Sequence, residues 1–248
     1  MKKLCLLLAL CLMFAAVSVR AEDASSRLAQ LQQLFSEENY EAVIAIVREP
    51  ADRGDAAMQT VLATCYFYGL GVDQDDELAL KYYRLAADQG HAEALYDLGN
   101  CYSYGMCVEQ DHAKALEYYL AAAEKGLAEA QVKAGWSYQY GYGAEPDAEK
   151  AFSYYHLAAD QGHSAGQYYL ASCYYRGEGV DQDYEKALLY LLPAADHGLP
   201  AAVFLLGDYC YEVRQNPDRA AELYRQALDA GYEPGPEELP RINELLGD

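Results

Sequence analysis

The sequence has few basic residues. Its 248 residues include 18 lysines and arginines against 39 aspartates and glutamates, which gives a formal net charge of −21 at pH 7. Nucleic acid and anionic lipid repel so acidic a chain, and neither is expected as a partner. The charge can steer in a basic protein partner, or it can serve only to keep the protein soluble. Because 52% of the residues are apolar, the chain can still bury a core and is not a disordered acidic tail.

The sequence also lacks an apolar run long enough for a membrane span. The run from Leu4 to Val17 has about 14 residues, whereas a bilayer span needs about 20. Lys2 and Lys3 precede this run, and the tetrapeptide SVRA follows it up to Ala21. This pattern predicts a secretory signal peptide over residues 1–21, and the alternative is a membrane anchor. Cleavage after Ala21 would remove three basic residues and no acidic one, so the charge of −21 would become −24. We therefore expect a periplasmic or secreted protein with no transmembrane anchor.

Motifs of catalysis and metal binding are missing as well. No histidine pair has the spacing of an HExxH zinc site, and no GxSxG elbow is present. The segment DQDDE (73–77) resembles the start of a calcium loop, but it lacks the central glycine and the distant glutamate. Helix capping explains this segment better. The sequence predicts a protein that is not an enzyme and that uses neither a metal nor a cofactor.

What the sequence does have is a period of 36 residues. The segment AADQGHAEAL (86–95) returns as AAEKGLAEAQ (122–131), as AADQGHSAGQ (158–167) and, more loosely, as AADHGLPAAV (194–203). The glycine of this segment recurs at the same interval, at Gly54, Gly90, Gly126, Gly162 and Gly198. Repetition at this length is typical of stacked supersecondary units. We therefore expect an array of equivalent units.

Each period has the pattern of a helix–turn–helix hairpin. In residues 91–126 an apolar stripe of helical spacing comes first, formed by Ala94, Leu98, Cys101 and Tyr102. Gly105 then ends the first helix, Asp111 is placed to cap a second helix, and Gly126 ends that one. The other copies repeat the turn glycine (Gly69, Gly141, Gly177) and the capping aspartate (Asp75, Asp147, Asp183). In the fifth copy the turn is three residues shorter, and Asn216 and Pro217 take the cap and the first helical position.

One hairpin cannot bury its stripe alone, so the hairpins are expected to stack and to close a continuous core. The run A-x-x-x-L-G-x-x-Y-x-x-G-x-G-V-x-x-D-x-x-K-A-x-x-Y-x-x-A-A-x-x-G resembles the Sel1-like repeat, a relative of the tetratricopeptide repeat. Departures from it are Cys107 and Ala144 in the turns, Pro193 within a second helix, and the shortened fifth copy. The resemblance implies an all-α fold, a right-handed α/α superhelical solenoid of helix–turn–helix repeats.

The periods also define the expected organisation of the chain. Residues 1–21 are the signal peptide, 22–54 an N-terminal helical hairpin and 232–248 a C-terminal capping segment. Five Sel1-like repeats occupy 55–231, with the boundaries 55–90, 91–126, 127–162, 163–198 and 199–231.

Five cysteines would remain after signal cleavage: Cys65, Cys101, Cys107, Cys173 and Cys210. An odd number leaves at least one thiol unpaired in a monomer. Cys65, Cys101 and Cys173 share one repeat column, which indicates small buried side chains. Equivalent positions of stacked helices lie about 10 Å apart, too far for a disulfide. The offset pairs Cys173–Cys210 and Cys101–Cys107 are the candidate disulfides.

The face of each first helix opposite its apolar stripe is the candidate partner-binding surface. Such a face lines the concave side of helical-hairpin solenoids, and here it is rich in aromatic residues, including the only tryptophan. Tyrosine and tryptophan dominate binding hot spots, although in a chain with 25 tyrosines the rings can instead fill space between repeats. The predicted partner-binding residues are Phe67, Tyr96, Asn100, Trp136, Gln139, Tyr168, Tyr175, Asp208 and Tyr211.

The resemblance implies a binding module, that is, a non-catalytic adaptor or scaffold of the bacterial periplasm or exterior that holds a protein partner on its concave face. Some exported bacterial members are similar to immunity proteins, so one alternative is an inhibitor that neutralises a secreted toxic effector enzyme such as a lipase. A second alternative is a binder of peptidoglycan or another cell-wall ligand. The regular cysteine pair of relatives with that role is absent here. A purely structural role in the envelope also fits the sequence, which does not specify the oligomeric state.

Overall fold

The computed structural model describes residues 21–247, and the regular secondary structure within that range is helical. The all-α prediction is therefore confirmed for the described part of the chain. The predicted signal peptide lies outside the described residues, apart from Ala21. Among the residues described, no helix combines the length and the apolar character needed to cross a membrane.

The chain divides into two compact units, Met1–Lys125 and Gly126–Asp248, which we call the N-terminal and C-terminal units. The helices of the N-terminal unit are α2 (Ala21–Ser36), α3 (Tyr40–Asp52), α4 (Ala56–Tyr68), α5 (Asp76–Asp88), α6 (Ala92–Tyr104) and α7 (His112–Glu124). Those of the C-terminal unit are α8 (Ala128–Tyr140), α9 (Ala148–Asp160), α10 (Ser164–Arg176), α11 (Tyr184–Asp196), α12 (Pro200–Asp208), the π-helical turn η1 (Tyr209–Val213), α13 (Pro217–Asp229) and α14 (Leu239–Leu246).

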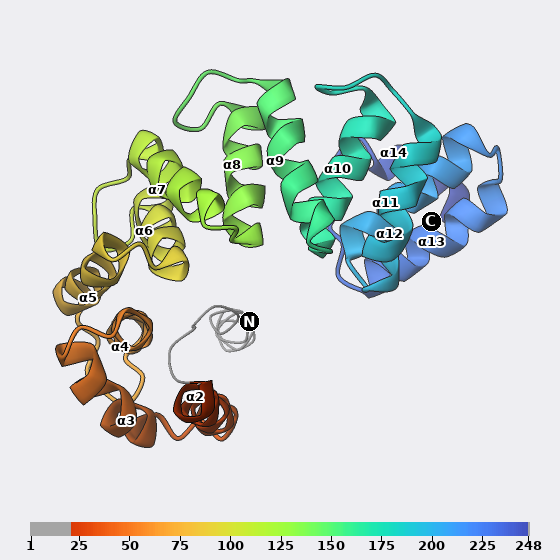
Figure 1. The fold of residues 1–248 in the computed structure, drawn as a ribbon. Coiled ribbons are helices and arrows are strands. Elements are labelled where there is room, and N and C mark those ends of the chain that lie inside the picture. Colours follow the sequence, from red (N-terminus) through yellow and green to blue (C-terminus); the bar gives the residue numbers. More distant parts are fainter. Residues whose placement is uncertain (1–20, 248) are drawn as a thin grey trace. The chain divides into compact units, whose positions relative to one another are not determined.

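Helices that follow each other in sequence pack as antiparallel pairs, as α4 with α5 and α10 with α11 in Figure 1. Consecutive pairs also pack on each other within a unit, through α5 and α6 in the N-terminal unit and through α9 and α10 in the C-terminal unit. The stacked-hairpin architecture that the 36-residue period predicts is thus present in both units.

The ends of the helices follow the predicted capping pattern. Asp75, Asp111, Asp147 and Asp183 each accept a hydrogen bond from the backbone N–H three residues later, at 2.9–3.0 Å. Asn216 does the same for α13, at 3.1 Å from the N–H of Arg219. These bonds satisfy donors that the first turn of a helix leaves open. The predicted second-helix starts are confirmed, including the one in the shortened fifth repeat.

The turn glycines end the first helices because they adopt a left-handed backbone. Gly105 has φ of 65° and donates its N–H to the carbonyl of Cys101, and Gly69, Gly141 and Gly177 repeat this arrangement. A side chain at such a φ is strained, so glycine is the favoured residue. At Cys107 the chain adopts φ of 62° without a glycine, which is the strained departure that the repeat comparison singled out.

Two sets of tyrosines join the helices within the hairpins. On one side, a first-helix tyrosine stacks on a second-helix tyrosine in four repeats: Tyr66 on Tyr82, Tyr102 on Tyr118, Tyr138 on Tyr154 and Tyr174 on Tyr190, with centroids 5.6–6.1 Å apart. Between the helices lies a second set, Tyr83, Tyr119, Tyr155 and Tyr224, at most 3% exposed. Burying such a ring contributes roughly 2–3 kcal/mol relative to leaving it in water.

The buried tyrosines require a small residue opposite each ring. A methyl group added to Gly99, Gly135 or Gly207 would lie 2.5–2.6 Å from the rings of Tyr119, Tyr155 and Tyr224, respectively. Contacts that short cannot exist without movement of the ring or the helix. The fourth repeat differs, because Leu191 replaces the tyrosine and Ala171 replaces the glycine, and both are fully buried.

Candidate partner-binding face

The nine predicted partner-binding residues lie on the first helices and on the π-helical turn, as their columns require. Phe67, Tyr96 and Asn100 belong to the N-terminal unit, on α4 and α6. The other six belong to the C-terminal unit, on α8 (Trp136, Gln139), α10 (Tyr168, Tyr175), α12 (Asp208) and η1 (Tyr211). We describe the two groups separately.

In the N-terminal unit the predicted polar residue, Asn100, forms a hydrogen bond within its own hairpin. The Tyr119 hydroxyl donates to Asn100 Oδ1 at 2.9 Å, and in the preceding repeat Tyr83 and Thr64 share a hydrogen bond of 3.0 Å. Tyr96 is half-buried, with its ring centroid 5.9 Å from that of Tyr119. Asn100 therefore stabilises the α6–α7 hairpin, whereas Tyr96 is in part open to solvent.

The third repeat, in the C-terminal unit, uses Gln139 for the same purpose. Its Oε1 accepts a hydrogen bond of 2.6 Å from the Tyr155 hydroxyl, and its Nε2 donates to Glu178 Oε2 at 3.0 Å. Because Trp136 stands where other repeats have a polar residue, the tyrosine hydroxyl bonds one helical turn further along. This shift leaves the indole outside the internal network of the hairpin.

Trp136 is the centre of an exposed group of aromatic residues, which we call the aromatic cluster: Trp136, Tyr140 and Tyr142. The indole stacks on Tyr142 at 4.8 Å and meets the edge of Tyr140 at 5.2 Å. Tyr140 is 54% exposed and Tyr142 is 38% exposed. The ammonium of Lys133 lies 5.8 Å from the indole ring. These contacts order the rings, and their outer surfaces remain accessible to a partner.

The fourth repeat buries one of its two predicted residues. Tyr175 is only 8% exposed and belongs to the main core of the C-terminal unit. Its hydroxyl donates to Glu212 Oε2 at 2.5 Å, and burial together with this bond raises the pKa of the phenol. Tyr168 is half-buried against Tyr169, and burial raises its pKa to about 12. Tyr175 is therefore a residue of the core. This differs from the expectation that it lies on the outer, partner-binding face of its helix.

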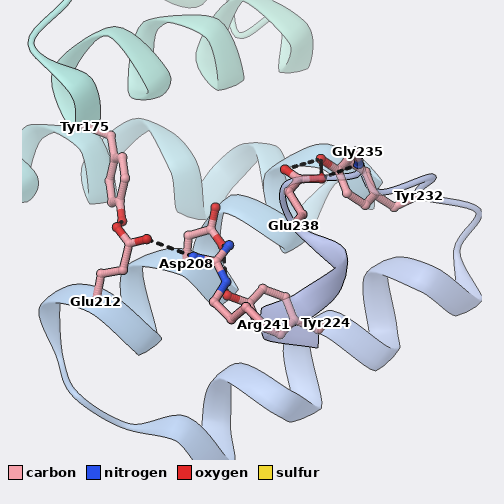
Figure 2. A network of polar contacts seen from close by, with 8 residues as sticks. All are labelled: Tyr175, Asp208, Glu212, Tyr224, Tyr232, Gly235, Glu238 and Arg241. Carbon is pink, nitrogen blue, oxygen red and sulfur yellow. Dashed lines mark hydrogen bonds and ion pairs between the residues drawn. The ribbon is translucent and has the colours of Figure 1, made fainter. Parts of the chain in front are cut away.

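In the fifth repeat the chain itself covers the predicted face. Arg241 of α14 forms ion pairs with Asp208 and with Glu212, the latter at 2.8 Å between Nη1 and Oε1. Its guanidinium carbon lies 5.6 Å from the ring centroid of Tyr211 and 5.5 Å from that of Tyr224. The Tyr224 hydroxyl donates to Asp208 Oδ1 at 2.8 Å. Figure 2 shows this network apart from Tyr211. Helix α14 thus contacts two of the nine predicted residues, Asp208 and Tyr211.

Burial changes the acidity of Asp208 within this network. It raises the pKa of this carboxyl to about 6, and Glu212 and Glu238 act in the same direction. Arg241 and the hydrogen bond from Tyr224 act in the opposite direction without reversing the shift. Asp208 thus holds its negative charge at neutral pH with the help of a cation.

Exposed tyrosines at the end of the first helices were missed by the sequence analysis. Tyr68, Tyr104 and Tyr140, which directly precede the turn glycines, are 49–55% exposed. The sequence does contain a signal for them, because a tyrosine stands at this position in three repeats. The position belongs neither to the apolar stripe of the first helix nor to the columns opposite that stripe. The final turn of a first helix points its last side chain away from the hairpin.

The five cysteines in the described part of the chain are free thiols, so neither candidate disulfide is formed in the structure. Cys101 and Cys173 are buried in the cores, and burial raises the pKa of both thiols to about 12. Cys107 lies in the following turn, where a hydrogen bond to Asp76 contributes to its raised pKa. None of these thiols has the depressed pKa of a nucleophile. In residues 21–247, no three His, Cys, Asp or Glu side chains are grouped so as to hold a metal ion.

A family model described as Sel1 repeat matches five consecutive segments, 56–91, 92–127, 128–163, 164–199 and 200–232. No curated protein matches the chain. A protective antigen of uropathogenic Escherichia coli strains, described as displaying an SLR fold, is 34% identical over 76% of this chain, with a TM-score of 0.70. The chain spans only 41% of that antigen.

Two further solved structures are similar to this chain. A Sel1 repeat protein of Oxalobacter formigenes is 26% identical, covers 88% of this chain and 95% of its own, and has a TM-score of 0.74. An immunity protein of Pseudomonas aeruginosa is 22% identical over 68% of this chain and 66% of its own, with a TM-score of 0.47. The last similarity is too low to support a shared function.

Proposed function

The chain belongs to the Sel1 repeat family, and from this premise we propose that it is a non-catalytic adaptor that binds a protein partner on its first-helix face. Sel1 repeat proteins act as protein-interaction modules. We propose further that the chain works outside the cytoplasm, in the periplasm or as a secreted protein. The predicted signal peptide supports this location.

The observation that carries the proposal is the exposed aromatic cluster. The third repeat already has a complete core without it, because Tyr155 is fully buried and its hydroxyl is bonded to Gln139. Three aromatic side chains on α8 and its turn are therefore in excess of what the hairpin needs. Large aromatic residues with little rotamer freedom to lose are the commonest anchors of protein interfaces.

The charge of the protein defines the class of partner. With a net charge of −21, the molecule attracts basic proteins over distances of about 10 Å at physiological ionic strength. A partner with a basic rim and an apolar centre would match an aromatic cluster on an acidic surface. Such a partner would associate faster at low salt than at high salt.

The test compares capture by the wild-type chain and by two variants, Tyr140→Ala and Trp136→Ala, from a periplasmic extract. We expect both variants to capture at least tenfold less of the same partner while melting within a few degrees of the wild type. Leu189→Ala is the matched control, because Leu189 is 65% exposed on the second helix α11. If this control loses the partner equally, or if all variants retain it, the first-helix face is not the binding surface.

A titration with soluble peptidoglycan fragments separates the protein partner from a cell-wall ligand. The proposal predicts no saturable binding of the fragments. Saturation that is lost in Trp136→Ala would assign the aromatic cluster to a glycan instead.

A further inference from the structure

The arginine of the last helix lies in a site that is built around it. We call this site the arginine cage and define it by Tyr175, Asp208, Tyr211, Glu212 and Tyr224. Figure 2 shows all of these except Tyr211, with Arg241 between the two carboxylates. Two aromatic ring centroids lie within 5.6 Å of the guanidinium carbon, and each of the two terminal nitrogens pairs with one carboxylate.

The walls of the cage are themselves fixed by the core. Tyr224 is fully buried and holds Asp208 through its hydroxyl, while Tyr175 is 8% exposed and holds Glu212 in the same way. The π-helical turn η1, which lies in the repeat with the shortened turn, carries Tyr211 and Glu212. Such turns often occur at functional sites, since they redirect the side chains they carry. Each carboxylate of the cage is therefore held by a tyrosine of the core as well as by Arg241.

The chemistry of the cage favours arginine over other occupants. A planar guanidinium can bridge two carboxylates and stack on aromatic faces at once, whereas the ammonium of lysine is a single point charge. Without a cation, Asp208 and Glu212 would be left facing each other beside Glu238 on a strongly acidic protein. The cage thus needs an occupant, and that occupant must be positive.

The helix that supplies Arg241 is held less firmly than the cage. Helix α14 has eight residues, of which only Ile242 is buried, and Leu239 is 42% exposed. The preceding segment GYEPGPEE (231–238) contains two glycines and two prolines. The Nε of Arg241 is buried without a hydrogen-bond partner, so the chain's own arginine leaves one donor unsatisfied. An arginine whose Nε also finds an acceptor would bind better.

We propose that α14 is an internal ligand of the arginine cage and that an arginine-bearing segment of the protein partner replaces it there. This inference rests on the proposed function and adds the chemistry of one contact point. The partner presents an arginine on a short helix or turn, with a hydrogen-bond acceptor placed for its Nε. The released α14 uncovers Asp208 and Tyr211, the two predicted partner-binding residues that it now occupies.

The test uses the full chain and a peptide as probe, so it needs no natural partner. The probe is an acetylated, amidated peptide of residues 238–246, ELPRINELL, and the control peptide carries citrulline, a neutral isostere, in place of arginine. The peptides are titrated into Arg241→Ala and into the wild type. We expect Arg241→Ala to bind the arginine peptide at least tenfold more tightly than the wild type does, because tethered α14 competes at an effective concentration on the order of mM.

Three controls keep the result specific to the cage. The citrulline peptide should bind at least tenfold more weakly, and adding Glu212→Gln to Arg241→Ala should abolish binding of the arginine peptide. Arg241→Lys, which retains the charge but cannot bridge, replaces Arg241→Ala if circular dichroism shows that the alanine variant is unfolded. Equal binding of both peptides, or equal binding to wild type and variant, would overturn the inference. So would a dimer formed by exchange of α14 between two copies.

Failure of this inference can be told apart from failure of the proposed function. If the peptide does not bind but capture of the partner still depends on Tyr140, the adaptor function stands and the cage is only a structural clamp. If the peptide binds as expected but no partner depends on the aromatic cluster, the cage is an arginine site and the proposed face is wrong.

Discussion

The third and fifth repeats carry the same columns on the same face of the C-terminal unit, yet they present them differently. In the third repeat Trp136 and Tyr140 belong to an exposed aromatic cluster. In the fifth repeat the aligned residues are Asp208 and Glu212, and α14 covers both through Arg241. The third repeat thus exposes aromatic surface, whereas the fifth repeat has charged residues that α14 contacts.

Beneath this difference the two hairpins are built alike. Each buries a second-helix tyrosine, Tyr155 or Tyr224, against a first-helix glycine, and each directs the hydroxyl to a polar residue of the variable face. The third and fifth repeats thus share the buried ring and its hydrogen bond, whereas the outer residues of the column differ between them.

The largest effect should follow from removing the buried rings. Tyr155→Ala and Tyr224→Ala are each expected to destabilise the protein by about 3–5 kcal/mol, because a fully buried aromatic side chain is lost and a cavity remains. Urea denaturation followed by circular dichroism measures this. A loss below about 1 kcal/mol at either position would contradict the claim that the two hairpins are built alike.

A smaller loss of folding stability is expected when the positive charge of Arg241 is removed from the arginine cage. Arg241→Gln should destabilise the protein by about 1–3 kcal/mol, since Asp208 is left buried with an unpaired charge. The matched control is Arg219→Gln, whose ion pair with Glu222 is exposed at both ends and should matter by less than about 1 kcal/mol. Equal effects in thermal melts would mean that the cage is an ordinary surface ion pair.

The acidity of Asp208 should give the fifth repeat its own pH dependence. The pKa of Asp208 is raised from 3.8 to about 6, so folding favours its protonated form. Its contribution, on the order of 2 kcal/mol, is fully present below about pH 4 and is lost as the pH rises through about 6. The difference in stability between wild type and Asp208→Asn should therefore change between pH 4 and pH 7. A constant difference would contradict the raised pKa.

The smallest effect on stability belongs to the third repeat. Trp136→Ala should change the free energy of unfolding by less than about 1 kcal/mol, because the indole is only half-buried and lies outside the core hydrogen bonds. Differential scanning calorimetry of the variant beside Tyr155→Ala provides the contrast. A loss as large as that of Tyr155→Ala would assign Trp136 to the core.

The sequence predicts the parts of this fold that depend on local chemistry. Asp111 caps α7 and Gly105 ends α6 because capping and left-handed turns involve residues a few positions apart. The periodicity also identifies the variable columns. It does not reveal that Asn100 is bonded to Tyr119, because that bond joins two helices and depends on which tyrosine of the Tyr118–Tyr119 pair points inward.

The contact of α14 with the fifth repeat could not be predicted from the sequence, for a different reason. The repeat with the shortened turn contains a π-helical turn, which places Tyr211 and Glu212 beside Arg241 of α14. A capping segment was expected over 232–248, but nothing in the repeat pattern shows that its arginine would bind the predicted face. Non-local contacts of a segment outside the repeats leave no periodic signal.

The central claim is that the exposed aromatic cluster binds a protein while the hairpin beneath it only supports the cluster. The most direct measurement is the affinity of the captured partner, once purified, for Tyr140→Ala by isothermal titration calorimetry, with the melting temperature recorded on the same sample. The account predicts an affinity at least tenfold weaker at an unchanged melting temperature. An unchanged affinity, or a loss accompanied by a large fall in melting temperature, would contradict it.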